Sequence, residues 1–140
     1  MPPQQTITFR VQYHEIDRMD TFYNSRALEW FEHGRCDLLR DMKLPYSDIE
    51  SRGVHLPVIE AHVEYLGRAG FDDLLEMTTT VSLAGRARLR FDMHVRHAAD
   101  VADGHAKRDV VRGYTIHAIT DRGGKPMRMA EWLSAAVSDR

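Results

Sequence analysis

The hydrophobic pattern of this 140-residue chain changes its period twice. Residues 6–13 (TITFRVQY) alternate apolar and polar side chains, which is typical of a half-buried strand, and Tyr13 is its last inward-facing residue. From residue 25 to residue 43 the apolar residues recur at helical spacing, and this spacing predicts an amphipathic helix of about five turns. The stripe that this helix should bury consists of Leu28, Phe31, Leu38, Leu39 and Met42.

After this helix the pattern returns to the period of strands. Leu44 and Pro45 end the helix, and the following YSDIESRG predicts one further short turn of helix. Four runs of alternating character follow, at residues 55–66, 74–83, 86–97 and 105–120. Turn signals separate them at residues 67–73, 84–85 and 100–104, and residues 129–137 predict a short closing helix.

This order predicts an α+β fold in which a five-stranded antiparallel sheet wraps around one long central helix. Strands joined by short turns favour antiparallel pairing, and the long helix is the only expected element large enough to cover the apolar face of the sheet. The length suits one domain spanning residues 1–140.

Composition narrows the classes of partner. The net charge of -2 argues against sequence-independent binding of nucleic acid, which needs a basic surplus. Cys36 is the only cysteine, so we expect neither disulfides nor a cysteine-rich zinc site. Without an export signal at the N-terminus or an apolar run of about 18 residues, we expect a cytoplasmic protein that does not bind membranes.

The segment just before the long helix carries the candidate chemistry. The loop contains Asp17, which is either a solvated turn residue or an acid or base of an active site. Its neighbours Glu15 and Asp20 are interpreted as solvated loop charges. A pair of His14 and Asp17 lacks a third ligand at a defined spacing, so no metal site is expected.

The start of the helix offers a second group. Backbone N–H groups near Tyr23, Asn24 and Ser25 should lack intrahelical partners, and the helix dipole favours negative charge there. Such donors can stabilise an oxyanion. The side chains of Asn24 and Ser25 are also good N-cap types, so a purely structural role stays open.

Three longer stretches of this chain resemble one known family. They are VQYHEIDRMDTFYNSRALEWFEHGR at residues 11–35, LPVIEAHVEYL at residues 56–66, and GRARLRF at residues 85–91, and the short turn FDD at residues 71–73 also matches. The chain resembles, from about residue 6 to residue 137, the hotdog-fold thioesterases related to 4-hydroxybenzoyl-CoA thioesterases and short-chain acyl-CoA thioesterases.

The resemblance implies hydrolysis of an acyl- or aroyl-CoA thioester without a cofactor. It also implies a homodimer, often a homotetramer, with the active site between two subunits. Asp17 would act as general base or as nucleophile, and the N–H of Asn24, helped by Tyr23, would bind the thioester oxygen. The loop departs from the family pattern, which usually has Gly at position 20, His at position 21 and an Asn pair at positions 23 and 24.

Further residues are candidates for binding the substrate. Tyr13 and Ser25 flank the loop, and Arg86, Arg88 and Arg128 are cations that could hold the phosphates of CoA. Arg86, Arg88 and Arg90 share one face of their strand, which an ordinary solvated charged face explains equally well. Glu32 and Arg35 on the long helix are interpreted as a partly buried ion pair.

Two alternative functions stay open. One is hydrolysis of a thioester on an acyl carrier protein, whose acidic surface would dock on basic residues between Arg86 and Arg96. The other is a hotdog module that binds an acyl thioester without hydrolysing it.

Overall fold

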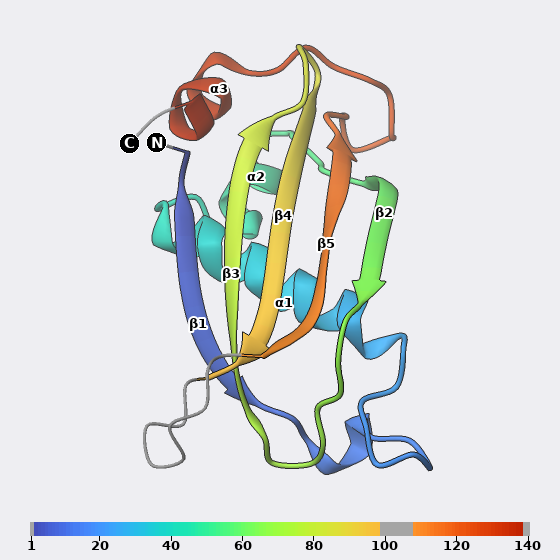
Figure 1. Cartoon of the computed structure of the whole chain (residues 1–140). Helices are drawn as coiled ribbons and strands as arrows, with labels where there is room; N and C mark the ends of the chain where they lie inside the picture. Colours follow the sequence, from blue (N-terminus) through green and yellow to red (C-terminus); the bar gives the residue numbers. More distant parts are fainter. Residues whose placement is uncertain (1, 99–107, 139–140) are drawn as a thin grey trace.

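A computed structural model describes residues 2–98 and 108–138, in which a long helix lies behind one antiparallel sheet of five strands (Figure 1). This confirms the expected fold class. The helices are α1 Arg26–Asp41, α2 Tyr46–Ser51 and α3 Glu131–Ser138, with a 3-10 turn at Tyr13–Glu15. The strands are β1 Gln4–Arg10, β2 Val58–Tyr65, β3 Leu74–Leu83, β4 Arg88–His97 and β5 Asp109–Ala118.

The strands lie in the order β1-β3-β4-β5-β2. Strands β3, β4 and β5 pair in succession, whereas β1 and β2 form the two outer strands. Strand β3 has the predicted bounds, and β2, β4 and β5 begin two to four residues later than their patterns suggested. The turn expected at residues 100–104 lies outside the described residues.

Helix α1 covers the inner face of the sheet with one stripe. Ala27, Trp30, Phe31 and Leu38 on this stripe are buried. The expectation was wrong for Leu28, which is 45% exposed although Leu39, three turns later on the same side, is buried. The chain after the helix covers Leu39, since it shares one cavity with Tyr46 and Leu56.

Gly34 sets how closely α1 approaches the sheet. A Cβ atom at this position would lie 2.5 Å from Oγ1 of Thr79 and 2.9 Å from Cε of Met77, both on β3. The absence of a side chain therefore allows the helix to lie against the central strands.

Tyr13 does not face inward. Strand β1 ends at Arg10 because Arg10 pairs with Leu74, the first residue of β3, and no partner strand continues beyond it. Val11 is still buried, but the 3-10 turn then carries Tyr13 to the surface, where it is 74% exposed. Its ring contacts Phe71 edge-on at 5.5 Å.

The remaining helices agree with the sequence. The short turn after Pro45 is α2, and the closing helix is α3, which packs against β3. Among residues 2–98 and 108–138, no helix has both the length and the apolar composition needed to span a lipid bilayer.

Candidate functional site

Asp17 lies in a small hairpin between β1 and α1. Ile16 and Phe22 form an antiparallel bridge, and the N–H of Asp17 donates to the carbonyl of Thr21 at 2.8 Å. At the tip, Asp20 has a φ of 59°. This left-handed conformation favours Gly, and Asp is among the few other residues that adopt it readily. Asp20 therefore fits a turn of the kind that a glycine would make.

The side chain of Asp17 is half-buried and held from one side. Its Oδ1 accepts the backbone N–H of Met19 at 2.7 Å, as in an Asx turn. Its other oxygen has no hydrogen-bond partner within residues 2–98 and 108–138. The carboxylate therefore shapes the turn with one oxygen and leaves the second available to a substrate or a water molecule.

The segment before β3 anchors this hairpin. Thr21 uses its hydroxyl twice, accepting the N–H of Ala69 at 3.1 Å and contacting the carbonyl of Ala69 at 3.3 Å. The N–H of Phe22 donates to the same carbonyl at 2.9 Å, and the guanidinium of Arg68 donates to the carbonyl of Met19. Thr21 thus has a structural role of its own in this loop.

Glu15 is not a solvated loop charge. It is 8% exposed, and its carboxylate accepts the N–H of Gln12 at 2.7 Å and the indole N–H of Trp30 at 2.8 Å. The interpretation from sequence was wrong because the indole donor lies fifteen residues further along the chain. Glu15 fixes the hairpin to the buried face of α1.

The start of α1 leaves fewer free donors than expected. The N–H of Tyr23 donates to the carbonyl of Glu15 at 2.8 Å, so it is not available to a substrate, and the Tyr23 side chain is 57% exposed. The N–H groups of Asn24 and Ser25 have no partner in the part of the chain that the structure describes. Ser25 makes no side-chain cap. The oxyanion donors are therefore reduced to these two N–H groups.

Tyr65 at the end of β2 positions this helix start. Its hydroxyl donates to the carbonyl of Asn24 at 2.7 Å, and its ring stacks on Phe22 at 6.1 Å. Burial raises the pKa of Tyr65 above its ordinary value, so the hydroxyl keeps its proton at neutral pH.

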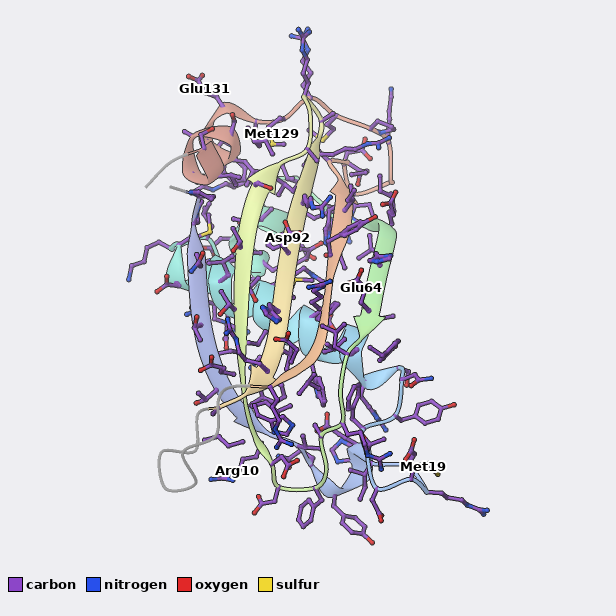
Figure 2. The ribbon with its side chains drawn as sticks, in the orientation of Figure 1. Arg10, Met19, Glu64, Asp92, Met129 and Glu131 are labelled. Carbon is purple, nitrogen blue, oxygen red and sulfur yellow. The ribbon has the colours of Figure 1, made fainter. Side chains whose placement is uncertain are left out.

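Arg86, Arg88 and Arg128 are exposed, but they lie at the opposite end of the sheet from Asp17. Figure 2 shows this separation, with Met19 at one end and Met129 at the other. Strand β3 runs between the two ends, and its ten residues span about 30 Å. One chain therefore does not bring these arginines to Asp17.

The strand between Arg86 and Arg96 is less basic than its sequence suggests. Arg90 pairs with Asp92 at 3.0 Å and lies over the ring of Tyr114, and Arg96 pairs with Glu76 at 3.5 Å. Arg90, Asp92 and Arg96 line a groove of about 470 Å³ on the outer face of the sheet, together with Glu64 and Arg112. Because its charges compensate one another, the groove offers no strongly basic surface for a carrier protein.

A second cavity, of about 270 Å³, lies between α1 and the inner face of β4 and β5. Arg35 of α1 lines it and donates to Oγ1 of Thr115 at 3.5 Å. The ion pair expected between Glu32 and Arg35 is not found among the described residues, although Glu32 opposes the loss of the Arg35 proton. Burial lowers the pKa of the Arg35 guanidinium from its usual value, yet an arginine stays charged.

His117 also lines this cavity, together with Glu32 and Tyr46, and sequence reasoning did not single it out. It is 3% exposed, its Nδ1 lies 2.9 Å from the carbonyl of Leu56, and its Nε2 lies 2.9 Å from Oγ1 of Thr115. Burial lowers the pKa of His117 to about 4; the hydrogen bond to Leu56 opposes this shift and the charge of Arg35 adds to it. His117 is therefore neutral at pH 7.

No group of three or more His, Cys, Asp and Glu side chains is placed to hold a metal ion within residues 2–98 and 108–138. His14 and Asp17, which the sequence sets three residues apart, have no third ligand in that part of the chain.

The comparison with protein families finds one match across most of the chain. The model described as the thioesterase-like superfamily matches residues 11–137. This range includes the hairpin, all of α1 and the four later strands.

Two curated relatives match less completely. A Bacillus subtilis protein named "Putative acyl-CoA thioesterase YneP" is 40% identical over 55 residues, which span 39% of this chain and 40% of that protein. An Aquifex aeolicus protein named "Putative esterase" is 27% identical over 111 residues, which span 79% of this chain and 87% of that protein.

Solved structures confirm the hotdog architecture. A hypothetical protein from Thermus thermophilus superposes with a TM-score of 0.83 at 25% identity, covering 96% of this chain and 95% of its own. A mutant 4-hydroxybenzoyl-CoA thioesterase in complex with 4-hydroxybenzoyl-CoA superposes with a TM-score of 0.85 at 15% identity, covering 97% and 99%. A 1,4-dihydroxy-2-naphthoyl-CoA thioesterase from Synechocystis gives 0.83 at 19% identity, covering 96% and 95%.

Proposed function

Because this chain belongs to the thioesterase-like superfamily, we propose that it is a thioester hydrolase that cleaves an acyl- or aroyl-CoA thioester with water. The observation that carries the proposal is the hairpin before α1. It holds one oxygen of Asp17 on the N–H of Met19, and leaves the other oxygen and the N–H groups of Asn24 and Ser25 without partners in the described part of the chain.

These groups supply the two requirements of the reaction. Hydrolysis forms a C–O bond to the thioester carbon and breaks its C–S bond, and negative charge develops on the carbonyl oxygen on the way. The free oxygen of Asp17 either takes a proton from the attacking water or attacks the carbon itself to form a mixed anhydride. The N–H groups of Asn24 and Ser25, at the positive end of the helix, stabilise the oxyanion. This chemistry needs no cofactor.

The complete site is proposed to form between two copies of the chain. Strand β2 is an outer strand (Figure 1). It carries Val58, Ile59 and Tyr65, each about half exposed. The edge of an outer strand favours pairing with a second strand. If two β2 edges pair antiparallel, the Tyr65 end of one lies beside the Val58 end of the other.

That pairing would bring the hairpin of one copy close to the Arg35 cavity of the other, although the two lie apart within a single chain. Tyr65 contacts Asn24 at the catalytic end, and Val58 lines the cavity of Arg35 at the other end. Arg86, Arg88 and Arg128 of the second copy would also approach the hairpin, where they could bind the phosphates of CoA. Light scattering of the purified protein should give a dimer or a tetramer; a monomer would contradict this arrangement.

The substitution Asp17→Asn tests the role of the carboxylate. It keeps the size of the side chain and an acceptor for Met19, so folding and CoA binding should change little. Removing a general base typically costs about 100- to 10,000-fold in rate. Thiol release from a panel of short, long and aromatic acyl-CoA esters measures this loss and identifies the acyl class.

Asp20→Asn is the matched control, because Asn also tolerates a positive φ and the position lies at the tip of the same hairpin. It should keep most of the activity. An Asp17→Asn variant that hydrolyses as fast as the original protein would reject the assignment. A wild-type protein that binds acyl-CoA esters but releases no thiol would instead indicate a binding module.

A further inference from the structure

We propose that the cavity between α1 and the inner face of β4 and β5 is a carboxylate-binding subsite, which recognises an acyl group whose far end carries a carboxylate. The inference rests on the proposed function, because the acyl group is that of the thioester hydrolysed at Asp17. The lining of the cavity and the charge of Arg35 are observed independently of that function.

Three hydrogen bonds join Arg35, Thr115, His117 and Leu56 in the cavity wall, and in each bond the donor can be assigned. The carbonyl of Leu56 can only accept, so His117 donates from Nδ1 and its Nε2 is an acceptor. The hydroxyl of Thr115 therefore donates to His117, and Oγ1 of Thr115 accepts from Arg35. Neutral His117 thus uses both ring nitrogens on the protein.

Arg35 is left with an excess of donors. A guanidinium has five N–H groups, and the hydrogen bond to Thr115, at 3.5 Å, is the one that Arg35 makes among the described residues. The charge is partly buried and has no carboxylate within ion-pair distance in that part of the chain. A partly buried cation of this kind is stabilised by an anionic partner that it can bind through two parallel hydrogen bonds.

Tyr46 provides a second donor toward the same space. Its hydroxyl oxygen accepts the N–H of Leu56 at 3.1 Å, which leaves the hydroxyl proton available. Tyr46 and Arg35 both line the cavity, and Leu39 and Phe91 contribute apolar wall. Glu32 also lines this cavity of about 270 Å³ without forming an ion pair with Arg35 among the described residues. Two donors beside an apolar wall fit a short aliphatic or aromatic chain ending in a carboxylate.

The position of the cavity requires the second copy of the chain. Arg35 lies ten residues beyond Ser25, about 15 Å along the axis of α1, which a short acyl chain held at Asn24 does not reach. In the proposed antiparallel β2 pair, the hairpin of one copy would lie beside Val58 of the other, and Val58 lines the cavity. The thioester would then be cleaved by one chain while its far end is bound by the other.

Substrate pairs of equal chain length test the subsite. Wild-type protein should hydrolyse glutaryl-CoA at least about tenfold faster, in kcat/KM, than valeryl-CoA, with the same order for succinyl against butyryl and adipoyl against hexanoyl esters. Arg35→Gln should remove this preference, so that the two members of each pair react at similar rates. Arg40→Gln, an exposed arginine of the same helix, should alter neither rate. Equal rates of wild-type protein on each pair would overturn the proposal.

Mixed dimers separate the roles of the two copies. Coexpressed Asp17→Asn and Arg35→Gln chains form one intact site in each heterodimer, so glutaryl-CoA hydrolysis should recover to about a quarter of the wild-type rate. Activity no greater than the average of the two separate variants would place Asp17 and the subsite in one chain, and would overturn the composite site.

A binding measurement keeps the subsite testable even if no ester is hydrolysed. Cys36 lines the same cavity, so glutarate should slow its alkylation by iodoacetamide. The protection should be absent with valerate and absent in Arg35→Gln. Protection without hydrolysis would retain the subsite and reject the proposed function, whereas hydrolysis of valeryl-CoA without protection would retain the function and reject the subsite.

Discussion

The indole Nε1 of Trp30 donates a 2.8 Å hydrogen bond to the carboxylate of Glu15, and this bond joins the buried face of α1 to the hairpin that carries Asp17. Glu15 also accepts the N–H of Gln12 at 2.7 Å. The hairpin is therefore held by a buried charge with two donors, and its position follows that of the helix.

Glu15→Ala should lower the free energy of unfolding by about 1–3 kcal/mol, because both donors lose their charged acceptor. Urea denaturation measures the loss. Glu29→Ala provides the control, since its carboxylate makes an exposed ion pair with Arg26 that contributes at most about 1 kcal/mol. Equal stability of the two variants would show that the buried bond has little effect.

Gly34→Ala should also destabilise the fold, by about 1–2 kcal/mol. The new methyl group would overlap the short side chain of Thr79, and this overpacking outweighs the gain in helix propensity of up to about 1 kcal/mol. Gly123→Ala is the matched control, because its Cβ would lie at an ordinary 3.5 Å from Asp121. Thermal unfolding of both variants gives the comparison, and an unchanged or higher midpoint for Gly34→Ala would contradict the close approach of helix and sheet.

The stability of the protein should depend on pH through His117. Its pKa is about 4 in the folded chain and about 6.5 when unfolded, so between these values the unfolded chain binds a proton that the folded chain does not. This contribution is fully present above pH 6.5 and decreases by about 3 kcal/mol as the pH falls to 4.

His117→Asn should flatten this part of the stability curve, because the amide can still donate to Leu56 but does not titrate. Denaturation at a series of pH values from 4 to 7.5 tests this, and a slope that persists in His117→Asn would assign it to other groups.

Tyr65→Phe should slow hydrolysis while the protein stays folded. The hydroxyl that fixes the carbonyl of Asn24 contributes about 0.5–1.5 kcal/mol, which corresponds to a rate loss of up to about tenfold if it acts on the oxyanion donors. Tyr114→Phe removes a similar hydroxyl, bonded to Glu60 on the outer face, and should have no effect on the rate. Steady-state kinetics with one acyl-CoA ester compares the two, and equal kcat values would separate Tyr65 from the site.

The sequence predicted those parts of the fold that depend on local periodicity. Strand β3 has its predicted bounds because it pairs with β1 along one edge and with β4 along the other, so its pairing covers the same residues as its alternating pattern. Tyr13 continued the pattern of β1 but not the strand, because pairing stops where β3 begins. Periodicity does not indicate where a partner strand ends.

The site was predicted only in part, because some of its residues depend on partners that lie far away along the chain. The position of Asp17 before the helix was evident from the sequence, whereas the burial of Glu15 depends on Trp30 and that of His117 on Leu56. These partners lie 15 and 61 residues away along the chain. The N–H of Tyr23 was expected to be free, and only its pairing with Glu15 across the hairpin shows that it is not.

The hydrogen bonds from Arg35 through Thr115 and His117 to Leu56 have a further consequence for the interior. Each group in this series donates to the next, from a cation at the cavity to a backbone carbonyl, so each donor and acceptor has one fixed role. A proton could travel along this series only if the hydroxyl of Thr115 rotated and His117 changed its tautomer. The carbonyl of Leu56 prevents that change, because it needs a proton on Nδ1 of His117. The wall behind the cavity therefore has fixed hydrogen-bond roles and provides no path for protons.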